Sequence, residues 1–261
     1  MPELHEVSYS REATIAAIRD YYQFLTTMYL PEGRVLEPPV GGWPSITREK
    51  VYFLGKNDEV FELMRHLPYL SEETLLAPYA EVADWPFMVD VSFEESDIEG
   101  TRVMTDGLDW EDIPSSAFGI TSGKDYFILD TQFGVVFWDG APGEVADTAA
   151  REPIIGDFFD CTPENEHGWR CNKAWAIADF FEVLKNRYRI LKYLPLHEYR
   201  IEEWFDQYEE GDGPNGDYPF LRAIRRVYKE HGWPDLSIYK KQECMDALDK
   251  MIRDRFPKED F

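Results

Sequence analysis

The chain of 261 residues lacks any long apolar segment and contains few cysteines. No apolar run approaches the roughly 18 residues that a membrane-spanning helix needs. The first residues, MPELHEVSYS, have no basic start followed by an apolar stretch, so we expect neither a membrane span nor a secretory signal. The low, odd number of three cysteines is typical of a reducing compartment and predicts a cytoplasmic or nuclear location.

Motifs that carry chemistry are also missing. The sequence has no glycine-rich phosphate loop, no GxSxG nucleophile elbow, no HExxH and no CxxC, and its five histidines lack the spacing of a metal pair. We therefore predict no catalytic residue, no metal ligand and no cofactor. Two alternatives stay open. One is a partial zinc site of Cys161, His167 and Cys171, and the other is a calcium site in DGLDWED, Asp106 to Asp112.

Basic residues are scarce in the middle of the chain. The formal net charge is −24, and residues 57–166 hold 26 acidic but only four basic residues, which gives this segment a charge of −22. Such a field repels the phosphates of nucleic acids and anionic membranes, and it attracts basic proteins. The charge predicts a basic protein partner and no direct binding of nucleic acid. The alternative is an acidic surface that serves only solubility.

What the sequence does contain is a clear succession of periodic patterns. Helical spacing of apolar residues predicts a first helix, capped by Ser8 or Ser10 and ended by Leu30, and further helices at residues 57–67, 172–194, 199–208, 218–231 and 237–255. Short alternating runs separated by Gly, Asp-Gly and Ser-Gly predict an antiparallel sheet within residues 78–140. An irregular segment follows the sheet and extends to Arg170.

These elements predict an α+β fold. We expect a central, mostly antiparallel sheet with flanking helices, plus a C-terminal helical extension. The apolar fraction of 44% and the aromatic fraction of 15% are enough for a sizeable core. A shift in composition places the sheet domain at residues 1–197 and the extension, packed on or beside it, at residues 198–261.

The stretch DYFILDTQFGVVFWDG, Asp125 to Gly140, predicts a β-hairpin. The apolar runs YFIL and VVFW flank a short turn with a glycine. Four apolar residues are expected on one face of the hairpin or on the neighbouring face: Phe127, Leu129, Val135 and Phe137. Asp130 and Asp139 both lie at turns, where an aspartate accepts hydrogen bonds from nearby backbone. The alternative makes these two residues the acid and base of a hydrolase.

A characteristic order of motifs runs through this part of the chain. LP follows the first helix, FGITSGKDYFILDTQFGVVFW supplies strands with glycine turns and an aspartate at a strand end, and AWAIADFFEVLKNRYRIL supplies the next helix. This order resembles the SUKH superfamily, which includes bacterial toxin-immunity proteins and fungal regulators of cell-wall synthesis. The residues at the superfamily's positions are Leu30, Pro31, Gly119, Gly123, Leu129, Asp130, Gly134, Val135, Phe180 and Phe181.

The resemblance covers residues 11–195 and is strongest over residues 117–193. It implies an α+β interaction domain with a concave sheet face and without catalytic residues. The chain departs from the pattern in three respects. Gly41–Gly42 is the only candidate for the glycine pair after the first helix, the acidic middle segment is long, and the C-terminal helices lie outside the pattern.

Together the patterns predict a non-catalytic intracellular interaction module whose acidic surface binds, and in an immunity-like role neutralises, a basic protein. The predicted partner-binding residues are expected in loops at one end or edge of the sheet: Glu94, Glu95, Asp97, Glu99, Asp106, Asp109, Trp110, Glu111 and Asp112. Trp110 is either an aromatic anchor of the interface or a plug that packs its loop on the core. The alternative function is an enzyme or small-ligand binder whose pocket is lined by Trp43, Trp138 and Trp169. The sequence predicts no particular oligomeric state.

Overall fold

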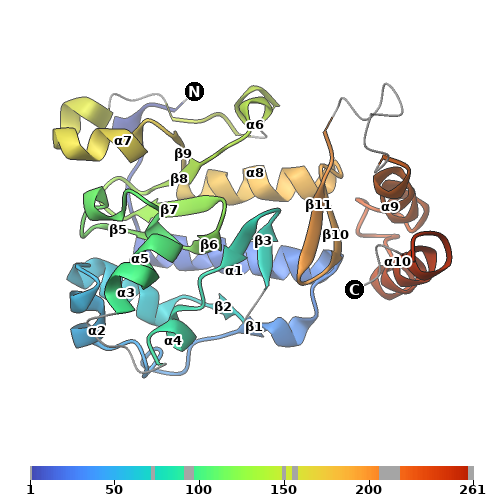
Figure 1. Ribbon diagram of the computed structural model, residues 1–261, viewed down its shortest axis with the longest axis horizontal. Helices are drawn as coiled ribbons and strands as arrows, with labels where there is room; N and C mark the ends of the chain where they lie inside the picture. The colour runs from blue at the N-terminus through green and yellow to red at the C-terminus, as the bar shows by residue number, and fades with distance from the viewer. Residues whose placement is uncertain are drawn as a thin grey trace.

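The computed structural model describes residues 2–71, 74–90, 97–148, 151–154, 158–205 and 218–257. Its centre is an antiparallel sheet of four strands in the order β5-β7-β8-β9 (Figure 1). These strands are β5 (Ala117–Gly119), β7 (Tyr126–Asp130), β8 (Val135–Asp139) and β9 (Lys173–Ala176). Helices flank the sheet, so the predicted α+β fold class is confirmed.

Strands β7 and β8 form the predicted hairpin. Phe127 pairs with Trp138 in antiparallel register. Because side chains alternate along a strand, Phe127 and Leu129 point to one face of the sheet, whereas Val135 and Phe137 point to the other. All five residues are buried, so both faces of this hairpin are covered by other parts of the chain.

One face of the sheet packs on two long helices, α1 (Arg11–Met28) and α8 (Ile177–Arg189). Ser10, one of the two predicted caps, accepts a hydrogen bond from the first turn of α1. Between helix and sheet, the Phe180 ring meets the Phe127 ring edge-on, with 4.9 Å between the ring centroids. Burial of one such side chain contributes about 1.5–3 kcal/mol, so this apolar layer is a main source of the stability of the sheet.

Smaller antiparallel sheets lie beside the central one. One joins β3 (Leu75–Ala77), β4 (Ala80–Val82) and β6 (Thr121–Gly123), and another joins β1 (Val35–Leu36) and β2 (Tyr69–Leu70). Two helices lie between β1 and β2 in the sequence, α2 (Arg48–Phe53) and α3 (Asp58–His66). The predicted cap of α3 is confirmed, because the Asn57 side chain accepts a hydrogen bond from the backbone of Val60 at 3.0 Å.

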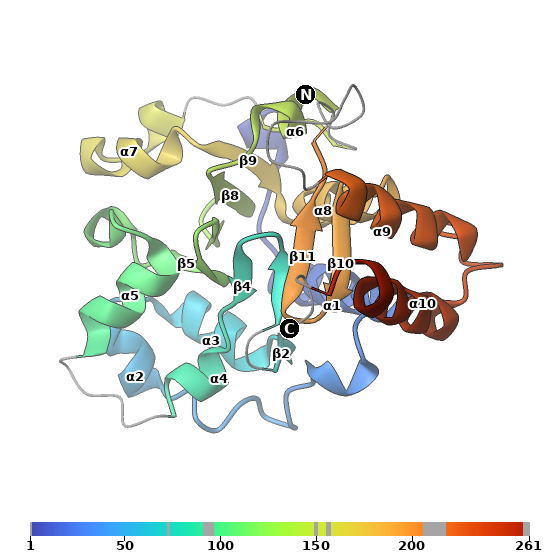
Figure 2. The same cartoon turned by 45° about the vertical axis from the view of Figure 1, so that its right-hand side comes forward.

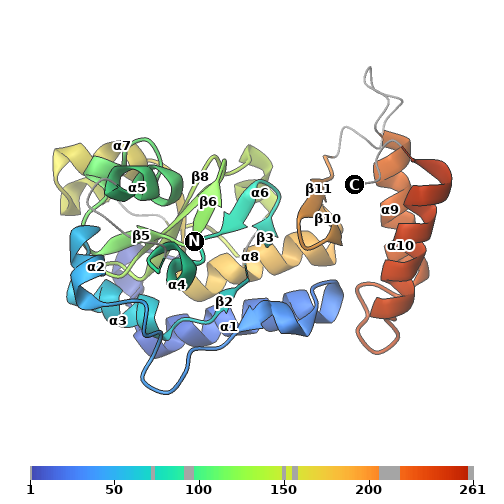
Figure 3. The same ribbon diagram turned by 60° about the horizontal axis from the view of Figure 1, so that its bottom comes forward.

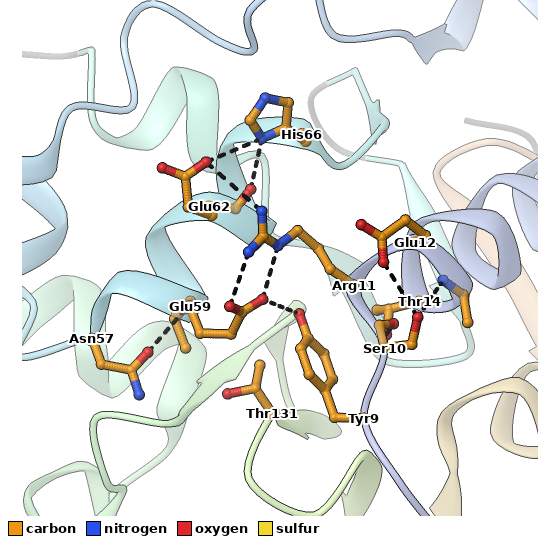
Figure 4. Close-up of polar contacts among 12 residues, drawn as sticks. Tyr9, Ser10, Arg11, Glu12, Thr14, Asn57, Glu59, Glu62, His66 and Thr131 are labelled. Atoms are coloured by element: carbon orange, nitrogen blue, oxygen red, sulfur yellow. Dashed lines mark hydrogen bonds and ion pairs between the residues drawn. The ribbon is translucent and has the colours of Figure 1, made fainter.

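An ion pair joins α3 to the start of α1, as Figure 4 shows. The Arg11 guanidinium donates to both carboxylate oxygens of Glu59, at 2.8 and 2.9 Å. The Tyr9 hydroxyl donates to the same carboxylate at 3.0 Å. Burial of the Tyr9 hydroxyl and its bond to Glu59 raise the pKa of Tyr9 above its usual range. The bidentate geometry fixes the angle at which the chain enters α1.

The sheet was predicted within residues 78–140, but two stretches of that range, WPFMVDVSF and TRVMTDG, contain helices in their described parts. They contain α4 (Trp85–Met88) and α5 (Ile98–Asp106). Asp84 caps α4 through the backbone of Phe87, and a proline occupies the first turn, as helix starts favour. In α5 the buried residues are Arg102, Thr105 and Asp106, a spacing of three and four that suits a helix, so the predicted place of this segment in the sheet was wrong.

The helix predicted between Asn172 and Leu194 is shorter than expected. Its first residues form β9, where Trp175 pairs with Val136 of β8. After α8, the chain forms a hairpin of β10 (Tyr193–His197) and β11 (Arg200–Glu203), so the helix predicted from residue 199 is wrong over its described part. Residues 193–196 are all buried, and a continuous apolar run does not distinguish a helix from a buried strand.

Two further helices, α9 (Tyr218–Glu230) and α10 (Lys241–Arg255), pack at one end of the molecule beside β10 (Figure 3). The Tyr228 hydroxyl donates to the carbonyl of Pro195 at 2.7 Å, and Lys241 Nζ donates to the carbonyl of Leu30 at 2.7 Å. The C-terminal helices therefore dock on the rest of the chain. The predicted domain boundary, between residues 197 and 198, falls inside the hairpin of β10 and β11. The division into two domains stays a prediction.

The segment predicted as irregular contains short helices in its described part. They are α6 (Gly143–Thr148), η5 (Phe158–Cys161), η6 (Glu164–Glu166) and α7 (His167–Arg170). Short turns of 3₁₀ helix also occur near the N-terminus, η1 (Leu4–Glu6) and η2 (Glu32–Arg34). Across all the described elements, no helix combines the length and the apolar character needed to cross a membrane.

Candidate interaction cleft

The outer face of the central sheet, which is turned away from α1 and α8, carries a cleft of about 360 Å³. One wall is the C-terminal end of α5 with the turn after it, and the other is α7 with the residues that follow it. Figure 2 shows α7 above α5, both to the left of β5 and β8. The floor consists of Tyr126, Ile128 and Phe137, so the predicted hairpin forms the base of the cleft.

A buried carboxylate fixes the α5 wall. Asp106 Oδ2 lies 2.6 Å from Lys56 Nζ and 3.1 Å from Arg102 Nε, and none of the three side chains is more than 10% exposed. The other oxygen of Asp106 accepts a hydrogen bond from the backbone N–H of Gly119 at 2.9 Å, which ties the wall to β5. Burial of the ammonium lowers the pKa of Lys56 to about 8, although the charge of Asp106 acts in the opposite direction.

Gly119 allows α5 to lie directly on β5. A Cβ atom at this position would lie 1.9 Å from the carbonyl oxygen of Thr105. Any side chain at this position would therefore push α5 away from the sheet and separate Asp106 from the backbone N–H that it accepts. Gly119 is one of the glycines on which the SUKH resemblance rests, and in this chain the close packing of α5 on β5 requires it.

A buried guanidinium fixes the α7 wall. Arg170 Nη1 lies 2.7 Å from Asp130 Oδ2, and Arg170 Nη2 lies 2.8 Å from Glu166 Oε2. The Arg170 side chain is fully buried, and its Cζ lies 4.2 Å from the centroid of the Trp169 ring and 5.0 Å from that of Phe133. Carboxylates around the edge and aromatic rings over the face suit a planar guanidinium. Asp130 ends β7, so this ion pair ties α7 to the sheet.

The 3₁₀ turn η4 (Trp110–Asp112) links the two walls. From the α7 wall, Trp169 Nε1 donates to the backbone carbonyl of Asp112 at 3.2 Å. From the α5 wall, Arg102 Nη2 donates to the backbone carbonyl of Trp110 at 2.6 Å. Because both walls bond to the same turn, their separation is fixed by backbone contacts rather than by surface side chains.

Four of the predicted acidic residues, Asp97, Glu99, Asp109 and Glu111, are exposed on or beside the α5 wall. Apolar side chains are exposed in the same stretch, with Leu108 86% and Met104 55% accessible. In the part of the chain that the structure describes, Glu99, Asp109 and Glu111 have no ion pair. Exposed apolar side chains surrounded by unpaired carboxylates are typical of an interaction surface.

Other predicted site residues lie elsewhere or have other partners. Asp106 is buried in the ion pairs of the α5 wall and does not belong to the exposed surface. Trp110 is partly buried, with Arg102 Cζ 4.8 Å from its ring centroid, so it packs its loop on α5. The carboxylate of Asp112 is partly buried and accepts a hydrogen bond from the Asn165 side chain at 3.1 Å. Glu94 and Glu95 lie outside the described residues.

The three tryptophans of the small-ligand alternative do not gather into one pocket. Trp43 Nε1 donates to the carbonyl of Leu67 at 2.8 Å and packs its loop on the core. Trp138 lies on the inner face of the sheet, with its ring centroid 6.1 Å from that of Phe180. Trp169 alone of the three lines the cleft, so this predicted pocket is wrong.

The hydrolase alternative is also wrong, because Asp130 and Asp139 lie at opposite ends of paired strands. Asp130 pairs with Val135 and Asp139 with Tyr126, which separates the two aspartates by about 13 Å along the strands. The turn interpretation of Asp130 is confirmed, because its Oδ1 accepts a hydrogen bond from the backbone of Gln132 at 2.8 Å.

The metal alternatives find no support in the described residues. Over residues 2–71, 74–90, 97–148, 151–154, 158–205 and 218–257, no group of three or more His, Cys, Asp or Glu residues is placed to hold a metal ion. Cys161 and Cys171 are exposed free thiols, and Cys244 is a buried one. The zinc and calcium hypotheses therefore play no part in the argument about function.

Sequence reasoning missed the floor of the cleft and its α7 wall. A signal for the floor was present, because Tyr126 and Asp139 are cross-strand partners in the predicted hairpin. No comparable signal brings Cys171 and Asn172 to the same place. A connection of more than thirty residues separates them from β8, and its path depends on the buried partner of Arg170.

A titratable carboxyl, that of Asp125, lies at the end of the hairpin, where it bonds to Trp138 of the inner sheet face and does not line the cleft. Burial raises the pKa of Asp125 to about 6, the hydrogen bond from Trp138 Nε1 opposes this change, and the charge of Asp139 adds to it. The Asp125 carboxyl is therefore half ionised near pH 6 and becomes fully charged only well above it.

Comparison of the chain with protein-family models, with curated proteins and with solved structures returns no match. The resemblance to the SUKH superfamily therefore stays a prediction.

Proposed function

We propose that the chain is a non-catalytic interaction module that holds a basic protein partner against the α5 wall of the cleft. The observation that carries the proposal is the surface on which unpaired Glu99, Asp109 and Glu111 accompany exposed Leu108. In such a surface the apolar contact supplies affinity, while the charges accelerate encounter and exclude acidic partners. No catalytic step is needed to explain this arrangement.

The distribution of charge over the chain supports this proposal. Residues 57–166, which include the whole α5 wall, carry a net charge of −22, and such a field attracts a basic protein while it repels nucleic acid. The SUKH resemblance implies a concave sheet face, and the cleft lies on the outer face of the sheet. The same proposal includes a cytoplasmic or nuclear location and an immunity-like role, in which binding neutralises the partner.

The experiment that tests the proposal compares two triple charge reversals. One variant, called the α5-wall variant, changes Glu99, Asp109 and Glu111 to Lys, in α5 and in the turns that follow it. The matched control changes Asp246, Asp249 and Asp254 to Lys, three exposed residues of α10 that alter the net charge by the same amount. Each tagged protein is incubated with extract of the source cells, and the recovered proteins are identified and quantified by mass spectrometry.

We expect one basic protein at about one-to-one stoichiometry with the unaltered chain and with the α10 variant, and its loss with the α5-wall variant. Raising the salt from about 0.05 M to 0.3 M should weaken the binding, because exposed charges are screened beyond about 8 Å near 0.15 M. Equal loss with both variants would reduce the effect to non-specific charge and contradict the proposed surface.

The small-ligand alternative keeps one supporting observation, the cleft itself. Its volume of about 360 Å³ falls at the lower end of the range for ligand pockets, about 300–1,000 Å³. A metabolite that raises the melting temperature of the unaltered protein, and whose effect disappears when the cleft floor is changed by Phe137→Ala, would favour this alternative over a protein partner.

A further inference from the structure

The mouth of the cleft carries two carboxylates with no partner of their own. Asp109 from the turn after α5 and Asp139 from the end of β8 both line the cleft, and both are exposed. Neither has an ion pair with any residue in the described ranges. They come from different elements, so their place at one cleft is a consequence of the fold rather than of a local acidic run.

The buried charges behind the walls do not neutralise this pair. Asp106 forms ion pairs with Lys56 and Arg102, and these three side chains together carry one net positive charge when Lys56 is protonated. Arg170 lies with Asp130 and Glu166, which gives one net negative charge. The two groups cancel each other to a first approximation. The field at the mouth is then set by Asp109 and Asp139, the two carboxylates that line it.

Beneath these carboxylates the cleft has an apolar, aromatic floor. Tyr126, Ile128 and Phe137 line it, and Trp169 lines its side. Aromatic faces attract a cation that lies over them, and the methylene stem of a long basic side chain covers apolar surface while its head meets the carboxylates. A cleft of about 360 Å³ suits one extended side chain better than a helix or a strand.

The same protein already uses this combination to hold a guanidinium. Arg170 lies between the carboxylates of Asp130 and Glu166, with its Cζ 4.2 Å from the ring centroid of Trp169 and 5.5 Å from that of Phe137. Phe137 and Trp169 also line the cleft. The cleft thus repeats, on an accessible surface, the two components that surround the buried guanidinium.

We propose that the cleft is a receptor for a single arginine side chain of the partner. The guanidinium binds between Asp109 and Asp139, and its stem lies on the partly exposed ring of Tyr126. Arginine fits better than lysine, because a planar fork addresses two separate carboxylates and stacks on rings, whereas an ammonium is a compact point charge. This inference rests on the proposed function, since it names the group by which the basic partner is recognised.

The test uses a capped tripeptide, glycyl-arginyl-glycine, as the probe. The matched control is the same peptide with citrulline, which keeps the shape of arginine but has no charge, and a second control carries lysine. The readout is alkylation of Cys171, an exposed thiol of the cleft lining, by iodoacetamide at low salt. Cys161, which is exposed but does not line the cleft, serves as the internal reference.

We expect the arginine peptide at millimolar concentration to slow alkylation of Cys171 at least about threefold, with Cys161 unaffected and with a weaker effect from lysine. The citrulline peptide should give no protection. The double variant Asp109→Asn, Asp139→Asn should abolish the protection, whereas Asp160→Asn, an exposed change in η5 outside the cleft, should preserve it. Equal protection by arginine and citrulline peptides, or protection that survives the double variant, would overturn the proposal.

The outcomes separate this inference from the proposed function. If the peptide gives no protection but extract still yields a basic protein that depends on Glu99, Asp109 and Glu111, the arginine site is wrong and the interaction module stands. If the arginine peptide protects Cys171 in the predicted manner but extract yields no basic protein, the arginine site stands and the proposed cellular role is wrong.

Discussion

The two walls of the cleft are held by buried ion groups of opposite composition. On the α5 wall one carboxylate, Asp106, lies between two cations, whereas on the α7 wall one guanidinium, Arg170, lies between two carboxylates. In each wall one partner lies four residues away on the same helical segment. The other partner, Lys56 or Asp130, comes from a distant part of the chain and ties the wall to the body of the protein.

The difference teaches that the type of a charged residue does not reveal its role in this chain. Asp106 and Asp109 are three residues apart in one acidic stretch, yet Asp106 is buried among cations and Asp109 is exposed at the mouth of the cleft. Burial of a charge is tolerated only with partners, so the position of Lys56 and Arg102 decides which aspartate is structural. Only carboxylates without a nearby cation, such as Asp109, stay exposed and can bind a partner at the surface.

The largest effect is expected when the α5 wall loses its central carboxylate. Asp106→Asn keeps an acceptor for the backbone of Gly119 but leaves Lys56 and Arg102 buried without a counter-charge, which should lower the free energy of unfolding by about 3–5 kcal/mol. Urea denaturation followed by circular dichroism measures this. Asp109→Asn is the matched control and should change stability by less than about 0.5 kcal/mol. Similar values for the two variants would contradict the structural role of Asp106.

A smaller loss is expected when the α7 wall loses its central cation. Arg170→Met preserves much of the apolar stem but leaves Asp130 and Glu166 without their partner. The Glu166 side chain is 11% exposed and lies at the edge, so it can turn toward water, whereas Asp130 is fully buried. We expect a loss of about 2–3 kcal/mol, measured by urea denaturation, with faster alkylation of Cys171. A loss larger than that of Asp106→Asn would reverse the ranking of the two walls.

Local sequence signals were sufficient for the sheet hairpin, for α1 and for α3. Their caps and apolar periods lie within a few residues, and Asn57 and Ser10 behave as their sequence positions indicate. Residues 101–107 were wrongly placed in the sheet because the run is short and ends in the turn signal Asp-Gly, whereas the face of α5 that turns inward consists of polar and charged residues. A helix that buries Arg102 and Asp106 has no apolar stripe to recognise.

The candidate site was predictable only in part, for the same reason. The acidic stretch that contains Asp109 and Glu111 stood out by composition, and the structure places these two residues at the surface. The sequence could not show that Tyr126 and Cys171 line the same cleft, because the α7 wall reaches the hairpin through the pairing of Arg170 with Asp130. That pairing joins residues forty positions apart.

A third prediction separates the walls by pH, because a lysine can lose its proton whereas an arginine cannot. The pKa of Lys56 is lowered to about 8 in the fold, so between about pH 8 and 10 the unfolded chain binds more protons at this residue than the folded chain. Stability from Lys56 therefore rises with pH in this window. The difference in unfolding free energy between the unaltered protein and Lys56→Met should shift by on the order of 2 kcal/mol in favour of the unaltered protein.

Urea denaturation at several pH values between about 7 and 10 measures this shift, and the same series on Arg170→Met supplies the comparison. The difference between that variant and the unaltered protein should stay constant over this range, because arginine keeps its charge. A constant difference for Lys56→Met as well would show that the lysine does not titrate in the window and would remove the contrast between the walls.

The smallest effect is expected at Asp125, a carboxyl that belongs to neither wall and has no ion pair within the described residues. Its pKa is raised to about 6 in the fold, so the folded chain holds the proton more tightly than the unfolded one. This contribution to stability is fully present below about pH 4 and is lost as the pH rises through about 6.

Asp125→Asn keeps an acceptor for Trp138 Nε1 and removes the charge. We expect it to stabilise the protein at about pH 7.5 by on the order of 1 kcal/mol, after allowance for the part of the carboxyl that water reaches, and to be nearly neutral at about pH 4. Thermal unfolding at the two pH values measures this. The sign is opposite to that of Asp106→Asn, because an aspartate among cations stabilises the fold whereas an aspartate without one opposes it. Destabilisation by Asp125→Asn at the higher pH would mean that a cation compensates Asp125 in the fold, which would contradict its raised pKa.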